Sequence, residues 1–163
     1  MSSNPALTPA ERRERIAQLA ALPSQVEAAV AGLSPAQLTT RYLANEWTVA
    51  QNVHHLADAH LNAFARIKLM LTAERPTFFA WDQPRWAETA DANGADLSDS
   101  LAMLRSLHSR WVRLLESLDE AQWQRAGLHP ERGEMTVDDQ LRVYSGHGKA
   151  HLEQIAKTLA AGK

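Results

Sequence analysis

The hydrophobic residues between Trp47 and Thr72 recur at helical spacing, and neither Pro nor Gly interrupts the stretch. Thr48 and Gln51 form a capping-box pattern, in which each side chain bonds the backbone amide of the other. The apolar positions make one stripe, formed by Val49, Val53, Leu56, Ala63 and Ile67. This pattern predicts a long amphipathic helix that turns its apolar face to the core.

A polar strip runs beside this apolar face and contains a histidine. At about 100° of turn per residue, the members of the strip fall within about 60° of His55. They are Gln51, His55, Asp58, Asn62 and Arg66. In a helical bundle such a strip is either solvent-exposed or one wall of a polar cleft, and both interpretations stay open at this point.

A second helical pattern begins near the N-terminus. Thr8, with Glu11 three residues later, predicts a capped start. Pro23 is expected to kink or end this helix, because proline has no backbone N–H. Ser24 can then restart a helix that lasts until Gly32.

Two further helices are predicted in the C-terminal half. The first is capped by Ser98 or Asp96, and its apolar stripe includes Leu101, Leu104, Trp111, Leu114 and Leu115. The last begins at Thr136, where residues 136–139 match a capping pattern, and it is expected to end near Leu159.

The stretch between the second and third main helices is rich in proline and aromatic residues. Residues 75–86 contain two prolines and four aromatic side chains, which need burial, so the stretch predicts a structured crossover instead of a flexible linker. No stretch predicts a strand, and residues 129–133 are expected to form a loop. The sequence therefore predicts an all-α fold, a four-helix bundle with a long crossover, in which residues 1–163 form one domain.

Composition narrows the class of protein. The chain has 163 residues, of which 45% are hydrophobic and 22% charged, as is typical of a soluble globular domain. A net charge of -2 argues against nucleic acid as the partner. The lack of cysteine excludes disulfides, thiolate ligands and a cysteine nucleophile. The N-terminus lacks the apolar core of a signal peptide, and no apolar run is long enough to span a membrane, so a cytoplasmic protein is expected.

Three histidines are candidates for a metal site. His147 and His151 are four residues apart on the last helix, so they share one face and can chelate one cation. His55 comes from another helix, and a catalytic zinc-type site uses three protein ligands and one open position. Satisfied or surface histidines are the alternative interpretation. Gly148, near the centre of the apolar stripe, is expected to let another helix approach closely.

The segment from Trp47 to His60 resembles the signature of the DinB superfamily, in its YfiT-like branch. Further similar motifs occur in order at residues 66–69, 107–111, 129–131 and 144–152. The resemblance implies a four-helix bundle, often a homodimer, that binds a divalent metal, zinc or nickel. It assigns the metal ligands to His55, His147 and His151. The sequence departs from the family at Gly146, where Trp is common, and at Ala150, where a second His is common, so substrate preference does not carry over.

Two further residues are candidates for catalysis. Asp58, one turn after His55, would accept a proton from a ligand imidazole, or it would form a surface salt bridge with Arg66 or Lys68. Tyr144, one turn before His147, would line the cavity and donate a hydrogen bond to substrate, or it would be a core tyrosine.

The remaining histidines and two tryptophans have weaker assignments. His54 is expected to be exposed or interfacial, and His60 to be a hydrogen-bonded core residue. His108 either packs in the core or lines the pocket, and His129 reaches the site only if its loop folds over it. Trp81 and Trp86 are mainly crossover residues that would roof the cleft.

Three functions are compatible with this site, and a small molecule is the expected partner. The resemblance favours a thiol S-transferase that uses bacillithiol, mycothiol or glutathione as a low-molecular-weight thiol, whose sulfur takes the open coordination position. The alternative is a metal-dependent hydrolase that uses a metal-bound water. A metal-binding stress protein without turnover is the third.

Overall fold

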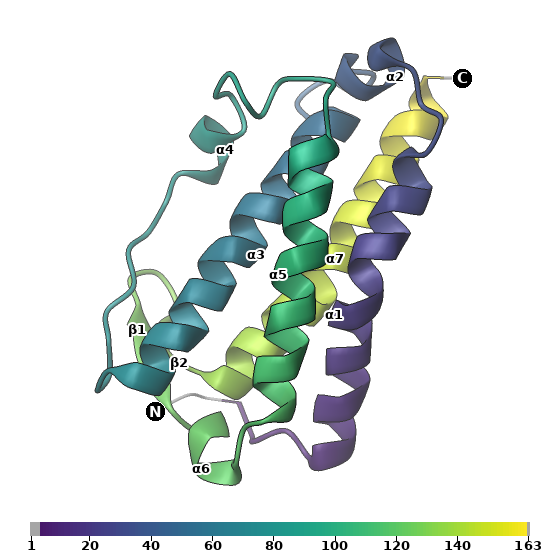
Figure 1. Ribbon diagram of the computed structural model, residues 1–163. Helices are drawn as coiled ribbons and strands as arrows, with labels where there is room; N and C mark the ends of the chain where they lie inside the picture. The colour runs from purple at the N-terminus through teal and green to yellow at the C-terminus, as the bar shows by residue number, and fades with distance from the viewer. Residues whose placement is uncertain (1–3, 163) are drawn as a thin grey trace.

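The computed structural model of the protein describes residues 4–162, and four long helices lie side by side in it (Figure 1). They are α1 (Pro9–Val30), α3 (Val49–Thr72), α5 (Ser98–Glu116) and α7 (Val137–Ala161). α1 and α3 each pack against both α5 and α7, so the four helices enclose a common core. The predicted four-helix bundle is confirmed.

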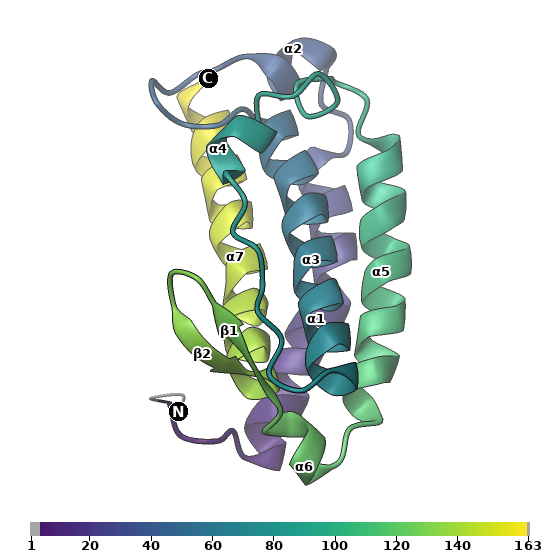
Figure 2. The ribbon, with the colours of Figure 1, turned by 90° about the vertical axis from the view of Figure 1, so that its left-hand side faces the viewer.

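Shorter elements connect the bundle helices. They are α2 (Pro35–Thr39), α4 (Gln83–Trp86), α6 (Glu120–Trp123), β1 (Ala126–His129) and β2 (Gly133–Thr136). Figure 2 shows that the crossover from α3 through α4 runs along the length of the bundle, with the β1–β2 hairpin beside its lower half. The crossover and the hairpin thus cover the side of the bundle formed by α3 and α7.

The starts of the long helices follow the capping chemistry of the sequence. Thr8, Thr48 and Thr136 each cap a helix through a complete capping box. At α5 the helix begins at Ser98, whose N–H bonds the Asp96 carboxylate at 3.0 Å. The predicted caps are therefore confirmed at the three threonines, whereas the predicted cap of α5 is wrong, because its N-cap residue is Leu97, which makes no side-chain cap.

Pro23 does not end α1, which runs unbroken from Pro9 to Val30. The predicted end and restart of the helix at this point are wrong. Because Pro23 has no N–H, the carbonyl of Leu19, four residues earlier, lacks its usual helical donor. The ring nitrogen Nδ1 of His108, on α5, lies 2.7 Å from that oxygen and replaces the missing donor.

The hairpin is the feature that the sequence pattern missed. β1 and β2 pair antiparallel, from Ala126 opposite Thr136 to His129 opposite Gly133. The prediction that no stretch forms a strand is therefore wrong. Each strand has four residues, too few for an alternating pattern to stand out. β1 also pairs with the crossover, because the Phe78 N–H donates to the Leu128 carbonyl at 2.9 Å.

Gly148 marks a close approach between α1 and α7. A Cβ at this position would lie 2.5 to 3.0 Å from the side chain of Leu22, so only glycine fits without a shift of that leucine. The predicted close helix approach is confirmed. Within the described part of the chain, no helix combines the length and the apolar character needed to cross a membrane.

Candidate metal centre

Three imidazoles from two helices converge in the bundle interior. His55 projects from α3, and His147 and His151 project from successive turns of α7. The Nε2 atom of His147 lies 3.3 Å from His55 Nε2 and 3.1 Å from His151 Nε2. The structure therefore brings together the three histidines that the sequence selected as metal ligands.

The polar strip of α3 is mostly buried and is not a solvent-exposed face. Gln51, His55, Asn62 and Arg66 are all buried, whereas Asp58 is only partly covered. Of the strip, His55 faces the other two histidines and Arg66 lines the adjoining cavity, whereas Gln51 donates to the Ala87 carbonyl.

A hydrogen bond fixes the ring of His151 in the tautomer that a metal ligand needs. Its Nδ1 lies 2.8 Å from Oδ1 of Asn52. The amide nitrogen of Asn52 donates to the Thr48 carbonyl at 2.9 Å, so its oxygen is the atom that faces His151. Nδ1 of His151 therefore carries the hydrogen, and Nε2 points a lone pair at the other two imidazoles.

A series of three hydrogen-bonded imidazoles fixes the tautomer of His147. We call this series, formed by His108, His60 and His147, the histidine relay. The relay starts at the Leu19 carbonyl, which can only accept, so Nδ1 of His108 donates to it. Nε2 of His108 then accepts from Nδ1 of His60 at 2.9 Å. Nε2 of His60 in turn accepts from Nδ1 of His147 at 3.2 Å. Nε2 of His147 is therefore left with a lone pair.

Burial keeps the rings of the relay and of the site neutral. It lowers the pKa of His108 and lowers the pKa of His60 well below its usual range. Burial, followed by the charge of neighbouring imidazoles, lowers the pKa of His55 and of His147 to about 3. Burial alone lowers the pKa of His151 to about 4. At neutral pH, metal binding at these rings needs no proton release.

The donor set fits a divalent cation. Two ligands at about 2.0–2.1 Å from a tetrahedral zinc ion lie about 3.3 Å apart, close to the 3.1 and 3.3 Å between these nitrogens. Nε2 atoms that face one another without hydrogens repel unless a cation lies between them. The residues present therefore match a three-nitrogen site with a remaining open position.

Indole rings flank the three imidazoles. The ring of Trp47 lies 4.6 Å from that of His55 and stacks on His151 at 6.0 Å. Trp81, from the crossover, stacks on His55 at 5.7 Å, and Trp86 contacts Trp81 at 4.6 Å. These apolar walls restrict water on two sides of the site.

A cavity of about 130 Å³ lies beside His147, between α3, α7, the crossover and the hairpin. Tyr144 lines it, and burial raises the pKa of its phenol, so the hydroxyl stays protonated at neutral pH. His129 also lines the cavity, because the hairpin lies over it. The polar part of the lining also includes Arg66, Gln140 and Arg132.

Asp58 and His54 lie on another part of α3. His54 Nδ1 bonds Ser100 Oγ at 2.8 Å, and its Nε2 lies 3.1 Å from the Gly94 carbonyl, so both nitrogens are used away from the site. Burial, and then the charge of Asp91, raises the pKa of Asp58. Asp58 is not among the residues that line the cavity. The structure thus brings Tyr144, but not Asp58, to the site.

Sequence reasoning missed the residues that orient the ligands. The pattern predicts His60 as a hydrogen-bonded core residue and His108 as either a core or a pocket-lining residue, and it does not single out Asn52. Two features of the sequence indicate these orienting residues. One is a proline within a helical pattern, which leaves a carbonyl without its helical donor, and the other is a histidine on the apolar stripe of a neighbouring helix.

The fold and the site define a class of helical proteins with a histidine-rich metal centre, and the chain belongs to the DinB superfamily, whose family model matches residues 18–155. The protein YfiT of Bacillus subtilis, named "Putative metal-dependent hydrolase YfiT", is 40% identical over 137 residues, which cover 83% of this chain and 77% of YfiT. A relative in Geobacillus thermodenitrificans named "Putative metal-dependent hydrolase" is 45% identical over 145 residues, which cover 88% of this chain and 81% of that protein.

A solved structure is also similar. It is described as "YfiT from Bacillus subtilis is a probable metal-dependent hydrolase with an unusual four-helix bundle topology". The TM-score is 0.91 at 35% sequence identity, and the match covers 97% of this chain and 91% of that chain. The predicted membership in the YfiT-like branch is confirmed, whereas the homodimer that the resemblance implies stays a prediction.

Proposed function

We propose that the protein is a metal-dependent hydrolase whose cation is held by His55, His147 and His151. The observation that carries the proposal is the convergence of their Nε2 atoms, with hydrogen bonds that leave lone pairs on His147 and His151. The names of the relatives from Geobacillus and Bacillus support it at the level of the reaction class.

Each part of the site has a role in this proposal. A divalent cation bound there would lower the pKa of a coordinated water toward about 7 and polarise a carbonyl. Tyr144 would donate a hydrogen bond to the substrate from its protonated phenol. Trp47 and Trp81 would exclude bulk water from the reacting group.

Metal content and ester hydrolysis test the proposal together. We expect purified protein to contain close to one equivalent of zinc or nickel by elemental analysis, and to hydrolyse members of an ester and amide panel. His147→Ala should lose both the metal and the hydrolysis, because the fold offers no replacement ligand at that position. His54→Ala, whose ring faces Ser100 and Gly94, should keep both. Full metal occupancy in His147→Ala would contradict the ligand assignment.

Thiol S-transfer is the second candidate, and the lining of the cavity favours it. The chain has no cysteine, so the sulfur must come from a small molecule. Arg66 and Arg132 line the cavity, and they would attract the carboxylates of a thiol such as glutathione. Conjugation of glutathione to monochlorobimane that depends on His147 would support transfer. Metal binding without hydrolysis or conjugation would leave a metal-binding stress protein.

A further inference from the structure

Arg66 is a buried cation without an acidic partner. Arg66 lies on the polar strip of α3 and is only 6% exposed. Among the residues that the structure describes, its Nη2 donates to the Phe79 carbonyl at 3.1 Å, its side chain also contacts the Tyr144 hydroxyl, and no ion pair involves it. Its Nε is buried with no acceptor. Burying an unpaired charge is costly, so this arrangement indicates that an anion from outside completes it.

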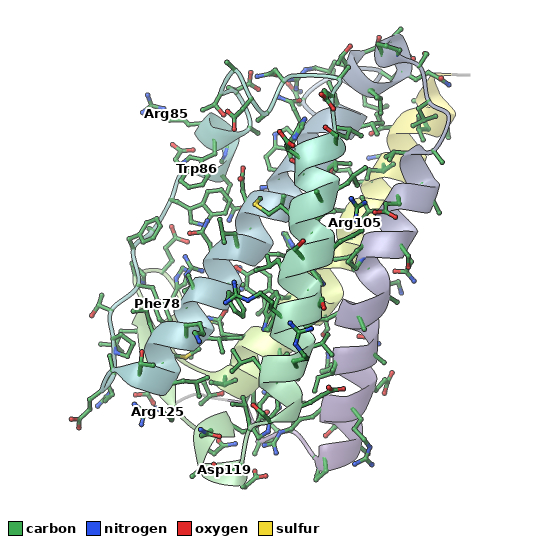
Figure 3. All side chains as sticks on the ribbon, viewed as in Figure 1. Phe78, Arg85, Trp86, Arg105, Asp119 and Arg125 are labelled. Atoms are coloured by element: carbon green, nitrogen blue, oxygen red, sulfur yellow. The ribbon has the colours of Figure 1, made fainter. Side chains whose placement is uncertain are left out.

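The guanidinium lies at the cavity beside the candidate metal centre. Arg66, Tyr144 and His147 line the same cavity, so a ligand there contacts both the cation and the histidine site. Phe78 packs against Arg66, with 5.6 Å between the guanidinium carbon and the ring centre. Figure 3 shows Phe78 on the crossover side of α3. The crossover thus holds the guanidinium at the cavity wall.

A second buried polar group in this cavity also lacks a partner. Gln140, on α7, is 1% exposed, and its Oε1 has no hydrogen-bond donor among residues 4–162. Its Nε2 has only a weak contact, 3.8 Å from the sulfur of Met135. The amide can turn either end toward a ligand, so it can supply a donor beside the guanidinium.

The charges around the cavity select a single negative charge. Arg132, in the hairpin turn, adds a second guanidinium to the lining, and Glu131 next to it adds a carboxylate. The net charge of these three side chains is therefore +1, which suits a carboxylate better than a dianionic phosphate. A guanidinium also matches the planar geometry of a carboxylate.

We propose that this cavity is a carboxylate-binding subsite, in which Arg66 binds the anionic end of a substrate whose reacting group lies at the three histidines. Arg66 and His55 are eleven residues apart on α3, about 16 Å along the helix axis, and long side chains lean toward the helix N-terminus. The substrate class is therefore a small carboxylic acid with its reactive bond several bonds away from the carboxylate. The assignment of a substrate class rests on the proposed hydrolase function. The binding of a carboxylate at Arg66 does not depend on that function.

A pair of matched probes tests the subsite in the zinc-loaded full-length protein. Glutaramate carries one carboxylate, and glutaramide is its neutral isostere. We expect glutaramate to shift the ¹H–¹⁵N signal of Arg66 Nε, and to bind at least about tenfold more tightly than glutaramide. Arg66→Gln should abolish this preference. Equal binding of the two probes, or no binding of either, would overturn the proposal.

Controls separate the subsite from general effects of charge and from the metal. Arg110→Lys alters a guanidinium that also lies over a ring, 5.5 Å from Phe64, but outside the cavity, and it should leave glutaramate binding unchanged. If Arg66→Gln fails to fold, Arg132→Gln in the exposed turn should still weaken glutaramate binding. Inorganic phosphate that binds more tightly than glutaramate would overturn the assignment to carboxylates.

The zinc-free protein distinguishes this inference from the proposed function. Glutaramate should still shift the Arg66 signal when zinc is absent. Binding that requires zinc and survives Arg66→Gln would place the carboxylate on the metal and refute the subsite. Glutaramate binding at Arg66 in a zinc protein that hydrolyses no ester would keep the subsite and reject the hydrolase.

Discussion

The ring of His147 can carry its hydrogen on either nitrogen, and the choice decides whether it can bind a cation. If Nε2 carried the hydrogen, that hydrogen would point at His55 and His151 and block coordination. The histidine relay prevents this, because each of its three rings donates a hydrogen bond from Nδ1, which leaves Nε2 of His147 without a hydrogen. The Leu19 carbonyl sets the direction of these hydrogen bonds, because a carbonyl accepts a hydrogen bond but never donates one.

Substitution of His60 tests this role. His60→Leu removes the acceptor of His147 Nδ1, so we expect zinc affinity to fall about 10- to 100-fold in a chelator competition assay. His60→Gln should restore most of the affinity, because its amide can accept from His147 and donate to His108. ¹⁵N shifts of His147 in the zinc-free protein should show one tautomer in the native chain and in His60→Gln, but a mixture in His60→Leu. A single tautomer in all three would contradict the relay.

At this scale the sequence predicted the ligands but not what orients them. Position on a helix face and the resemblance to the family both selected His55, His147 and His151, because helical spacing fixes which residues share a face. The relay joins rings on α3, α5 and α7 and ends on α1. Its existence depends on how each helix is rotated in the bundle, which a periodic pattern defines only to within a wide stripe.

At the scale of elements, the two glycines of α7 have opposite surroundings. Gly148 faces Leu22 of α1 at a distance that excludes a methyl group, whereas nothing lies within 4 Å of a Cβ at Gly146. Gly148 therefore permits the contact between α1 and α7, and Gly146 only weakens the helix.

Alanine at each glycine should separate these effects. Gly146→Ala should raise the free energy of unfolding by about 0.5–1 kcal/mol, because alanine favours the helix. Gly148→Ala gains the same amount but overpacks the contact with Leu22, so it should be less stable than Gly146→Ala by about 1–3 kcal/mol. Urea unfolding measures both variants. Equal stability of the two would show that α1 and α7 do not pack as described.

The long helices were predictable because their caps and stripes are local, whereas the hairpin was not. β1 is held by β2 and by the crossover at Phe78, a partner about fifty residues away in the sequence. Pairing over that separation leaves no periodic signal in a four-residue strand. The hairpin matters for the site, because it brings Arg132 and His129 to the cavity.

At the scale of the whole molecule, the buried neutral histidines make stability depend on pH. In the unfolded chain an imidazole titrates near pH 6.5, but in the fold His55 and His147 titrate near pH 3 and His151 near pH 4. Between these values the unfolded state binds more protons than the native state. The free energy of unfolding therefore decreases as the pH falls below about 6.5.

Urea unfolding of the metal-free protein at about pH 7 and about pH 5.5 measures this dependence. Each of the three histidines should lower the free energy of unfolding by roughly 1.3 kcal/mol between these two pH values, because its unfolded-state pKa of about 6.5 lies within the window. His151→Asn should remove one such contribution and flatten the slope by that amount. Identical slopes for His151→Asn and the native chain would contradict the buried neutral state.

Pro23 lies outside the cavity, yet the tautomer of a ligand depends on it. Any other amino acid at this position would reintroduce an amide hydrogen in reach of the Leu19 oxygen and set the backbone in competition with His108. Substitution of Pro23 would weaken the hydrogen bond between His108 and the Leu19 carbonyl, from which the histidine relay leads to His147. A missing amide hydrogen in α1 thereby affects how readily the bundle binds an ion in its interior.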